Sequence, residues 1–517
     1  MALAGGAVSC VASEGDLPAT VIRLSEVQVV DQALKQALPI QMVKLDRIQQ
    51  RFALRVAEDE FQPNFNLSIG SSLAGSKDRS ASPNQSTALL ASSLTPSVDL
   101  RLPSGGSMSV TYVTLRDFTD LSPDPTAAYP LTQWGANWNI SLSQPLLRGA
   151  GWTAATANLR MARLGNQQNI EQLRDTVMGV VSQALGLYRA FGAASRALEI
   201  ARTSFQRGEE LLDQNRLLAR QGQLSDLEIK QAEANRATRQ LSLLSSENAH
   251  DAARLALVRF LQLEDQMQIE PAEEPAVEKV TISRDEAMQM AFQTRPDVKV
   301  MRLNTQAIQI SADVADNSLL YDLNLVTSLA GPGTSSANSF FKANEVLGRA
   351  DKLNWSVGVV MNIPLWGDYS RRQAALGARI AVEKQEQAER QLMLNVQTDV
   401  LNSLRNLRIT EQQLEIASAN AGLARQAYEG QAEKLKSGLS STFQLRQQED
   451  SLLQAENAEV EARVGYRNAV TQLWQTLGTL NRRWGIKVDD IETDAQRMEP
   501  DYVRTRNKPW DRLMKGR

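Results

Sequence analysis

The clearest pattern in the chain is an alternation of apolar and polar residues that ends at a proline. In residues 354–366, NWSVGVVMNIPLW, apolar side chains fall on every second position from Trp355 to Leu365, and mostly small or polar residues lie between them. A period of two predicts a β-strand with one apolar and one polar face. The pattern recurs in residues 137–147, NWNISLSQPLL, where Pro145 takes the corresponding place. The recurrence indicates an internal duplication.

A helical segment and a further alternating strand precede each of these strands. The helical patterns cover residues 24–60 and 283–316, and the strands that follow them lie at residues 64–70 and 321–325. Ser25 is a candidate N-cap, and Pro39 and Pro296 predict an interruption at matching places in the two helices. Two strands in each half give four amphipathic strands per chain.

The strands of the first half are separated by a segment rich in Ser, Pro, Gly and Thr, residues 73–135. Its composition predicts a long loop, whose centre resembles a hairpin turning at residues 104–106. The corresponding segment of the second half, residues 331–353, is much shorter. Long loops of this kind are typical of the outer rim of a bacterial barrel.

Helical patterns of exceptional length follow Pro145 and Pro364. Apolar or small residues recur in them at intervals of seven, which is the period of a coiled coil. In the first half these positions are Val177, Ala184, Phe191, Leu198, Phe205 and Leu212, and in the second half they are Met393, Val400, Leu407, Leu414, Ala421, Tyr428 and Leu435. A single helix over residues 370–436 would be roughly 100 Å long at about 1.5 Å per residue.

A glycine and a serine three residues later interrupt each long pattern. The pairs are Gly222 with Ser225 and Gly438 with Ser441. A glycine that ends a helix, followed by a serine that can cap the next one, predicts a tight helical hairpin. We expect the returning helices to reach about Leu263 and Leu477. The chain then divides into five segments: an N-terminal tail 1–23, a first repeat 24–265, a linker 266–282, a second repeat 283–484 and a C-terminal extension 485–517.

The composition of the chain argues against several classes of function. The chain of 517 residues carries 56 basic and 59 acidic residues, so no excess of charge favours a nucleic acid partner. One histidine, His250, and one cysteine, Cys10, are too few for a transition-metal site or a histidine-based triad, so we expect no enzyme, cofactor or metal. The chain contains no run of about 18 apolar residues, so the sequence predicts no helical membrane span.

Residues 1–10, MALAGGAVSC, have no basic region and too short an apolar part for a complete signal peptide. Cys10 follows Ala-Val-Ser, which loosely resembles a lipidation box without its leucine. An incidental cysteine in an unstructured N-terminus fits this sequence equally well.

Four strands cannot close a membrane barrel, because small barrels need about eight strands and an open edge in lipid leaves backbone groups unpaired. The strands would therefore come from several chains. Polar strand faces would line a water-filled lumen. Trp138, Trp355 and Trp366 fall near predicted strand ends, where aromatic girdles lie. Packed aromatic residues are the other interpretation of the same positions.

The chain resembles the TolC-type outer-membrane efflux proteins over nearly its whole length. The resemblance is carried by the duplicated order of helix, strand, loop, strand, proline, long helix and hairpin, with Gln144-Pro145-Leu146 and Ile363-Pro364-Leu365 at the strand exits and Gly222 and Gly438 at the helical turns. No single one of these motifs is specific to the family, but their ordered duplication is.

The resemblance implies a mainly α-helical homotrimer with a membrane β-barrel portion. A 12-stranded barrel would contact outer-membrane lipid, and the helical hairpins would form an α-barrel in the periplasm. The implied role is a passive exit duct of a tripartite efflux pump or a type I secretion system. Its tips, at Gly222, Ser225, Gly438 and Ser441, would dock to a periplasmic adaptor protein that serves an inner-membrane pump.

In that family polar and charged side chains just beyond the tip turns close the tunnel. By position, the candidates for this constriction are Asp226, Glu228, Gln231, Gln444, Arg446 and Gln447. Gln444 and Gln447 are neutral where a carboxylate ring would select cations, so strong cation selectivity is not implied. Solvation of the helix ends is the simpler explanation for each of these residues.

A different class of protein, a coiled-coil structural or adaptor protein that spans the periplasm without a pore, is the alternative. Such a protein needs neither lipid-facing strands nor strands that end at prolines. The exported substrate and the partner pump cannot be predicted from the sequence.

Overall fold

The computed structural model forms two compact units, and each unit is built from segments of both halves of the sequence. The helical unit comprises Met1–Arg47, Glu171–Lys299 and Leu392–Arg517, and the sheet unit comprises Ile48–Ile170 and Val300–Gln391. The residues that the structure describes are 21–78, 85–122, 131–221, 225–264, 268–272, 278–335, 340–348, 353–437 and 439–504.

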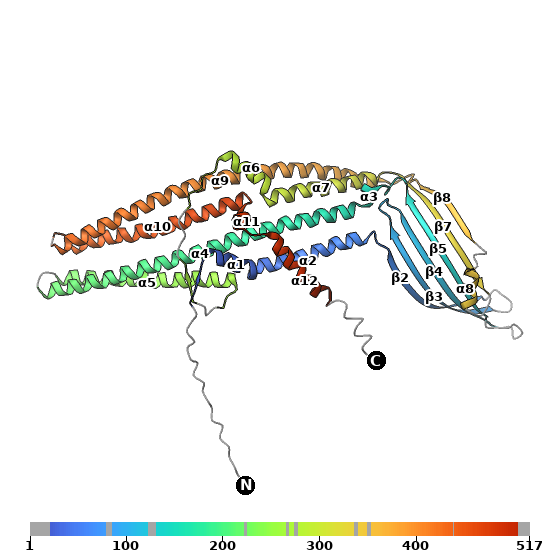
Figure 1. The fold of residues 1–517 in the computed structure, drawn as a ribbon, viewed down its shortest axis with the longest axis horizontal. Coiled ribbons are helices and arrows are strands. Elements are labelled where there is room, and N and C mark those ends of the chain that lie inside the picture. Colours follow the sequence, from blue (N-terminus) through green and yellow to red (C-terminus); the bar gives the residue numbers. More distant parts are fainter. Residues whose placement is uncertain are drawn as a thin grey trace, which may run out of the picture. The chain divides into compact units, whose positions relative to one another are not determined.

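Two helical hairpins dominate the helical unit (Figure 1). Helix α4 (Ala157–Arg220) is followed by α5 (Asp226–Leu261), and α9 (Tyr369–Lys436) by α10 (Thr442–Thr476). Ion pairs join the two arms of each hairpin, Arg236 to Glu209 at 2.9 Å in the first and Arg425 to Glu456 at 2.7 Å in the second. The predicted hairpins and the long helix of residues 370–436 are confirmed.

Many of the heptad positions contribute to the core of the helical unit. Those that are buried are Val177, Ala184, Phe191, Leu198 and Leu212 in α4, and Val400, Leu407 and Ala421 in α9. The coiled-coil period therefore identified the packed face of both long helices, because an apolar residue every seven positions stays on one side of a helix.

Shorter helices begin each half. Helices α1 (Glu26–Gln36) and α2 (Leu38–Asp59) meet next to Pro39, and α6 (Arg284–Thr294) and α7 (Pro296–Asn317) meet at Pro296. Ser25 and Ser283 accept hydrogen bonds from the backbone N–H groups of Gln28 and Glu286, at 3.4 and 3.3 Å. Both predicted proline interruptions and the Ser25 cap are confirmed.

Several short elements were not predicted. Strand β1 (Val21–Leu24) pairs in parallel with β6 (Gln268–Pro271), so part of the expected N-terminal tail and part of the expected linker form a two-stranded sheet. The remaining short helices are α3 (Trp152–Ala155), α8 (Phe340–Gly348), α11 (Leu480–Arg483) and α12 (Val488–Arg504).

The sheet unit contains one antiparallel sheet of six strands in the order β2-β3-β4-β5-β7-β8. The strands are β2 (Asn64–Asp78), β3 (Gln85–Arg101), β4 (Ser107–Ser122), β5 (Leu131–Pro145), β7 (Asp322–Ser335) and β8 (Asn354–Asn362). The prediction of four strands per chain is therefore wrong.

The error lies in residues 73–135, which were expected to be a loop. Strand β2 continues to Asp78, and the expected central hairpin is confirmed but consists of two full-length strands, β3 and β4. Serine and threonine were taken as loop residues, yet in a two-faced strand they occupy the polar face. Every second residue of β3 from Leu90 to Leu100 except Ser92 is apolar or proline, and this was the signal that composition obscured.

Candidate functional site: the two-faced sheet and the hairpin tips

Register divides the six strands into an apolar and a polar face. One row of directly paired residues crosses the whole sheet and is apolar throughout: Phe65, Val98, Val110, Ile140, Leu329 and Trp355. The adjacent row is polar throughout: Asn64, Asp99, Ser109, Ser141, Ser328 and Ser356. Because neighbouring positions of a strand point to opposite faces, the sheet has one apolar and one hydrophilic surface.

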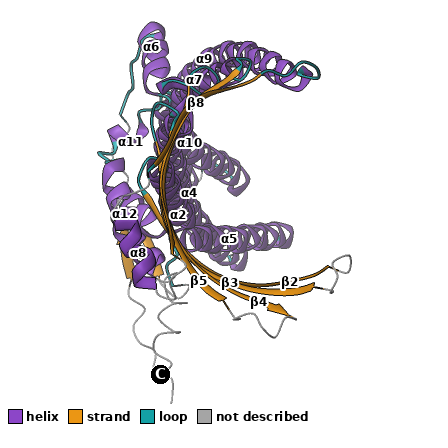
Figure 2. Ribbon diagram, turned by 90° about the vertical axis from the view of Figure 1, so that its right-hand side faces the viewer, coloured by secondary structure: helices purple, strands orange, loops and turns teal. Residues whose placement is uncertain are grey.

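The apolar surface lies on the convex side of the sheet. Figure 2 shows helix α8 against the convex side, and the Phe340 ring of α8 lies 5.7 Å from the ring of Trp134. Tyr112, on the same face as Trp134, donates a hydrogen bond to Asn344 of α8. The polar face is therefore concave, as expected of strands that surround water.

The three predicted girdle tryptophans lie at different heights of the sheet. Trp355 lies near the start of β8 and Trp366 just beyond its end, and both are largely exposed. Trp138 lies in the middle of β5, where its indole packs on Gly331 of β7, since a Cβ atom at that glycine would lie 2.4 Å from the indole nitrogen. Only Trp355 and Trp366 thus flank a strand.

Both hairpin tips are built around the same capping box. Ser225 donates its backbone N–H to Glu228 Oε2 at 3.1 Å, and Ser441 donates its backbone N–H to Gln444 Oε1 at 3.4 Å. The Ser441 hydroxyl in turn accepts the N–H of Gln444 at 3.3 Å. Glu228 and Gln444, both predicted constriction residues, therefore fix the starts of the returning helices. The tip glycines Gly222 and Gly438, like Cys10, lie outside the described residues.

The other predicted constriction residues surround these caps. Asp226, Gln231 and Gln447 are exposed, and the guanidinium of Arg446 lies 5.2 Å from the centre of the Phe443 ring. Among the described residues, no hydrogen bond or ion pair joins the first tip to the second. The structure thus brings the candidates together within each hairpin.

Exposed apolar side chains accompany both caps and were missed as functional candidates. Leu227 and Phe443 each lie two residues after the capping serine, with exposed fractions of 65% and 60%, and Leu439 of the second tip is also exposed. Their matching offset from Ser225 and Ser441 was visible in the sequence. Apolar side chains that gather on a surface can mark a protein-binding site, so these residues become candidates for one.

A buried ion pair joins the two hairpins away from the tips. Arg239 of α5 contacts Glu449 of α10 at 2.9 Å, and both side chains are almost fully buried. Burial raises the pKa of Glu449 above its ordinary value, although the positive charge of Arg239 opposes this. The residues are 210 positions apart, so no local pattern predicts the pair.

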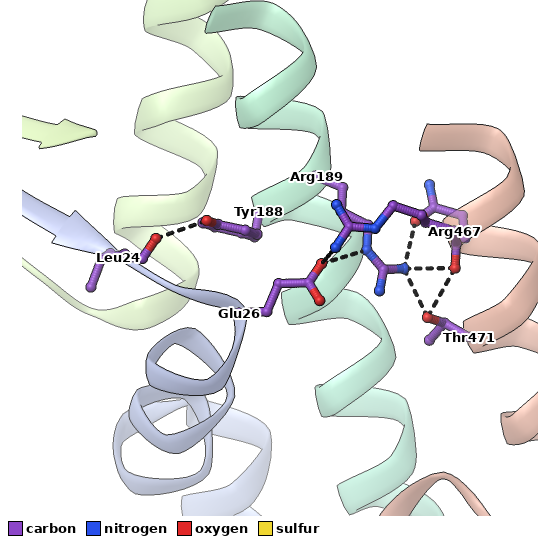
Figure 3. A network of polar contacts seen from close by, with 7 residues as sticks. Leu24, Glu26, Tyr188, Arg189, Arg467 and Thr471 are labelled. Atoms are coloured by element: carbon purple, nitrogen blue, oxygen red, sulfur yellow. Dashed lines mark hydrogen bonds and ion pairs between the residues drawn. The ribbon is translucent and has the colours of Figure 1, made fainter. Parts of the chain in front are cut away.

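A second buried network connects the start of the chain to both hairpins (Figure 3). The carboxylate of Glu26 accepts hydrogen bonds from Arg189 of α4 at 2.8 Å and from Arg467 of α10 at 2.9 Å. Arg189 also donates to the Thr471 hydroxyl at 2.8 Å. One carboxylate oxygen thus accepts from two buried guanidinium groups, which would be costly to leave unpaired.

The described residues contain no cluster of three or more His, Cys, Asp or Glu side chains placed to hold a metal ion. Among the described helices, none combines the length and apolarity needed to cross a membrane.

Comparison with known proteins identifies relatives by sequence and by fold. Residues 287–479 match the family model described as outer membrane efflux protein. No curated protein sequence matches the chain.

Solved outer-membrane channels share the fold. The CmeC outer membrane channel of Campylobacter jejuni is similar with a TM-score of 0.65 and 14% identity over 92% of this chain and 89% of its own. The outer membrane protein VceC of Vibrio cholerae has a TM-score of 0.63 and 13% identity over 88% and 96%. The MtrE outer membrane channel of Neisseria gonorrhoeae has a TM-score of 0.60 and 14% identity over 88% of each chain. Residues 287–479 are thus similar to the outer membrane efflux protein family, and the fold of these solved outer-membrane proteins is shared along nearly the whole length of the chain.

Proposed function

We propose that this protein is the exit duct of an export machine, a passive channel through which an inner-membrane pump or secretion system discharges its cargo. The match of residues 287–479 to the outer membrane efflux protein model and the fold shared with solved outer-membrane channels support a place in the bacterial outer membrane, with the helical portion in the periplasm. The observation that carries the proposal is the division of the sheet into an apolar convex face and a polar concave face. A convex apolar face suits contact with lipid, and a concave polar face suits a water-filled lumen.

Three copies form the channel in this proposal. A single open sheet leaves the outer edges of β2 and β8 without partners in lipid, which is unfavourable, so the wall is completed by strands of other copies. Trp355 and Trp366 anchor β8 at the two membrane interfaces. The nine residues of β8 match the length that a tilted strand needs to cross a bilayer.

The hairpin tips are the gate and the docking surface in this proposal. Asp226, Gln231, Arg446 and Gln447 form the constriction, with Glu228 and Gln444 holding the helix starts on which they sit. Leu227 and Phe443 bind a periplasmic adaptor protein, together with Ser225 and Ser441 and the turns that contain Gly222 and Gly438. The matching offsets of the polar and apolar residues in both tips support this assignment.

Conductance of the purified protein in planar bilayers tests the gate. We expect small, flickering currents from the parent and larger currents from the double variant Asp226→Asn/Arg446→Gln, because the substitutions remove charges at the constriction without removing a cap. Asp251→Asn, an exposed carboxylate far along α5, is the control and should leave the conductance unchanged.

Each outcome of this measurement decides one part of the proposal. Stable current that the double variant does not alter would keep the duct and remove the constriction from these residues. Folded protein that forms no heat-resistant trimer in detergent and conducts no current would favour a structural coiled-coil protein without a pore.

A further inference from the structure

The hairpin of β3 and β4 spans the full height of the sheet. Strand β3 pairs with β2 over the whole of β2, from Asn64 with Asp99 to Asp78 with Gln85, and β4 pairs with β5 from Ser107 with Ser143 to Thr119 with Leu131. The hairpin therefore separates β2 from β5 along their entire lengths. It is part of the sheet and does not extend beyond one end of it.

The turn of this hairpin lies at the end of the sheet where the strands join the helices. The carbonyl of Ser104 accepts the N–H of Gly151, which follows β5 and precedes α3. Gly105 has a φ of 94°, and a Cβ atom there would lie 2.2 Å from the carbonyl oxygen of Gly149. Glycine is thus required at the turn for two reasons, and the hairpin is packed tightly against the strand exit.

The hairpin also continues both surfaces of the sheet. Val98 and Val110 lie in the apolar row between Phe65 and Ile140. Ser97 pairs with Asn66 on one side and with Thr111 on the other, on the polar face. A hairpin lying in water would have no reason to match the apolar row of its neighbours.

The two free edges of the sheet are compatible with each other. Among the described residues, β2 pairs only with β3, and β8 pairs only with β7. Since the sheet is antiparallel and has an even number of strands, β2 and β8 run in opposite directions. The β8 edge of one copy can therefore continue the antiparallel pattern along the β2 edge of the next, with apolar residues such as Phe65 and Trp355 on one common face.

We propose that each copy contributes all six strands to the membrane wall, so that three copies close a barrel of 18 strands in which β8 of one copy pairs with β2 of the next. This inference rests on the trimer of the proposed function and departs from the 12 strands that the family resemblance implies. Because barrel diameter grows roughly linearly with strand number, the lumen would be about 1.5 times as wide as that of a 12-stranded barrel. Within the membrane such a lumen would admit bulkier cargo.

Cysteine accessibility tests whether β3 and β4 belong to the wall. In trimers reconstituted in liposomes and carrying Cys10→Ser, a water-soluble maleimide should label Ser97→Cys and Thr111→Cys on the polar face. It should not label Val98→Cys or Val110→Cys, which are adjacent in sequence but face lipid. Equal labelling of all four would place the hairpin in water and overturn the proposal.

Cross-linking between copies tests the closing edge. Ser68→Cys, on the polar face of β2, is combined in turn with Ser356→Cys, Gly358→Cys and Val360→Cys, since the register between copies is not given by one chain. At least one pair should give oxidised dimers and trimers on a gel, and Ile69→Cys with the same partners should not, because its side chain is on the apolar face. Failure of all three pairs would count against the β2–β8 junction.

A cryo-electron microscopy map of the purified trimer counts the strands directly. Eighteen strands are the expected result. A trimer with twelve strands would overturn this inference and leave the exit duct intact, whereas protein that forms no trimer in the membrane would overturn the proposed function itself.

Discussion

The sheet and the helical hairpins differ in how far their patterned apolar side chains are exposed. Phe191 and Val400 are completely buried between helices of the chain, whereas Phe65 and Trp355 of the sheet are 77% and 72% exposed. Both sets follow a strict period, of seven in the helices and of two in the strands. The hairpins bury these heptad side chains within the chain, whereas the sheet leaves its apolar face exposed. In the proposed duct that face contacts lipid, so the two regions would depend on different solvents for stability.

The largest loss of stability is expected from a substitution in the hairpin core. Phe191→Ala removes a ring that is fully buried and packs 5.3 Å from the ring of His250. We expect a loss of about 3–5 kcal/mol of unfolding free energy, from lost burial and the cavity left behind. Chemical denaturation followed by circular dichroism measures it. Leu423→Ala, at an exposed position of α9, is the control and should change stability by no more than about 0.5 kcal/mol.

A charge placed on the apolar face of the sheet tests whether that face contacts lipid. Val357→Arg introduces a cation on the apolar face of β8, and we expect a cost of about 2–4 kcal/mol if it lies near the middle of the bilayer. Ser356→Arg, one residue earlier on the polar face, should be tolerated. The yield of heat-resistant trimer in purified outer membranes compares the two. Equal yields would mean that the apolar face does not contact lipid.

The buried carboxylate between the hairpins gives the helical unit a dependence on pH. Because the pKa of Glu449 is raised in the folded protein, the folded state binds its proton more readily than the unfolded state. This contribution to stability is fully present below the unfolded pKa and is lost as the pH rises through the folded pKa, with a slope of at most about 1.4 kcal/mol per pH unit.

Melting temperatures of the parent and of Glu449→Gln, measured from pH 7 down to pH 4, check this sign. The parent should gain stability relative to the variant as the pH falls. A difference that is constant with pH, or that changes in the other direction, would show that Glu449 has no raised pKa.

The smallest effect is expected at the hairpin tips, where little is buried. Ser441→Ala removes the hydroxyl that accepts the N–H of Gln444, at a cost of about 1 kcal/mol. Ser225→Ala should behave in the same way at the other tip. Ser451→Ala is the matched control, since that hydroxyl bonds only to a carbonyl of its own helix, that of Gln447. Hydrogen exchange of the first turns of α5 and α10 resolves effects of this size.

Prediction from sequence succeeded for elements that a local pattern of residues defines. The alternation in β8, the heptads of α4 and α9, the cap at Ser25 and the breaks at Pro39 and Pro296 are all local patterns. The sequence also contained the serine-led capping boxes of the tips, although Glu228 and Gln444 were interpreted as constriction residues only, without their role as caps. Their place in a constriction stays a prediction.

Prediction failed where the composition of a segment fits both a loop and a strand, or where a short element depends on its neighbours. Residues 85–122 are rich in Ser and Thr, and only pairing with β2 and β5 distinguishes their polar strand face from a loop. Helix α8 was missed because a nine-residue helix is defined by the sheet on which it packs. The two periods, the helix ends and the apolar stripes could therefore be predicted from local sequence, because backbone geometry and solvent act on neighbouring residues.

Long-range packing sets which stripes meet, how many strands the sheet has and which charges are buried. Glu26 meets Arg467, and Arg239 meets Glu449, across hundreds of residues of chain. Such contacts depend on the register between distant segments. A local pattern cannot encode that register, because a shift by one residue in a strand or by one turn in a helix preserves the pattern and changes every partner.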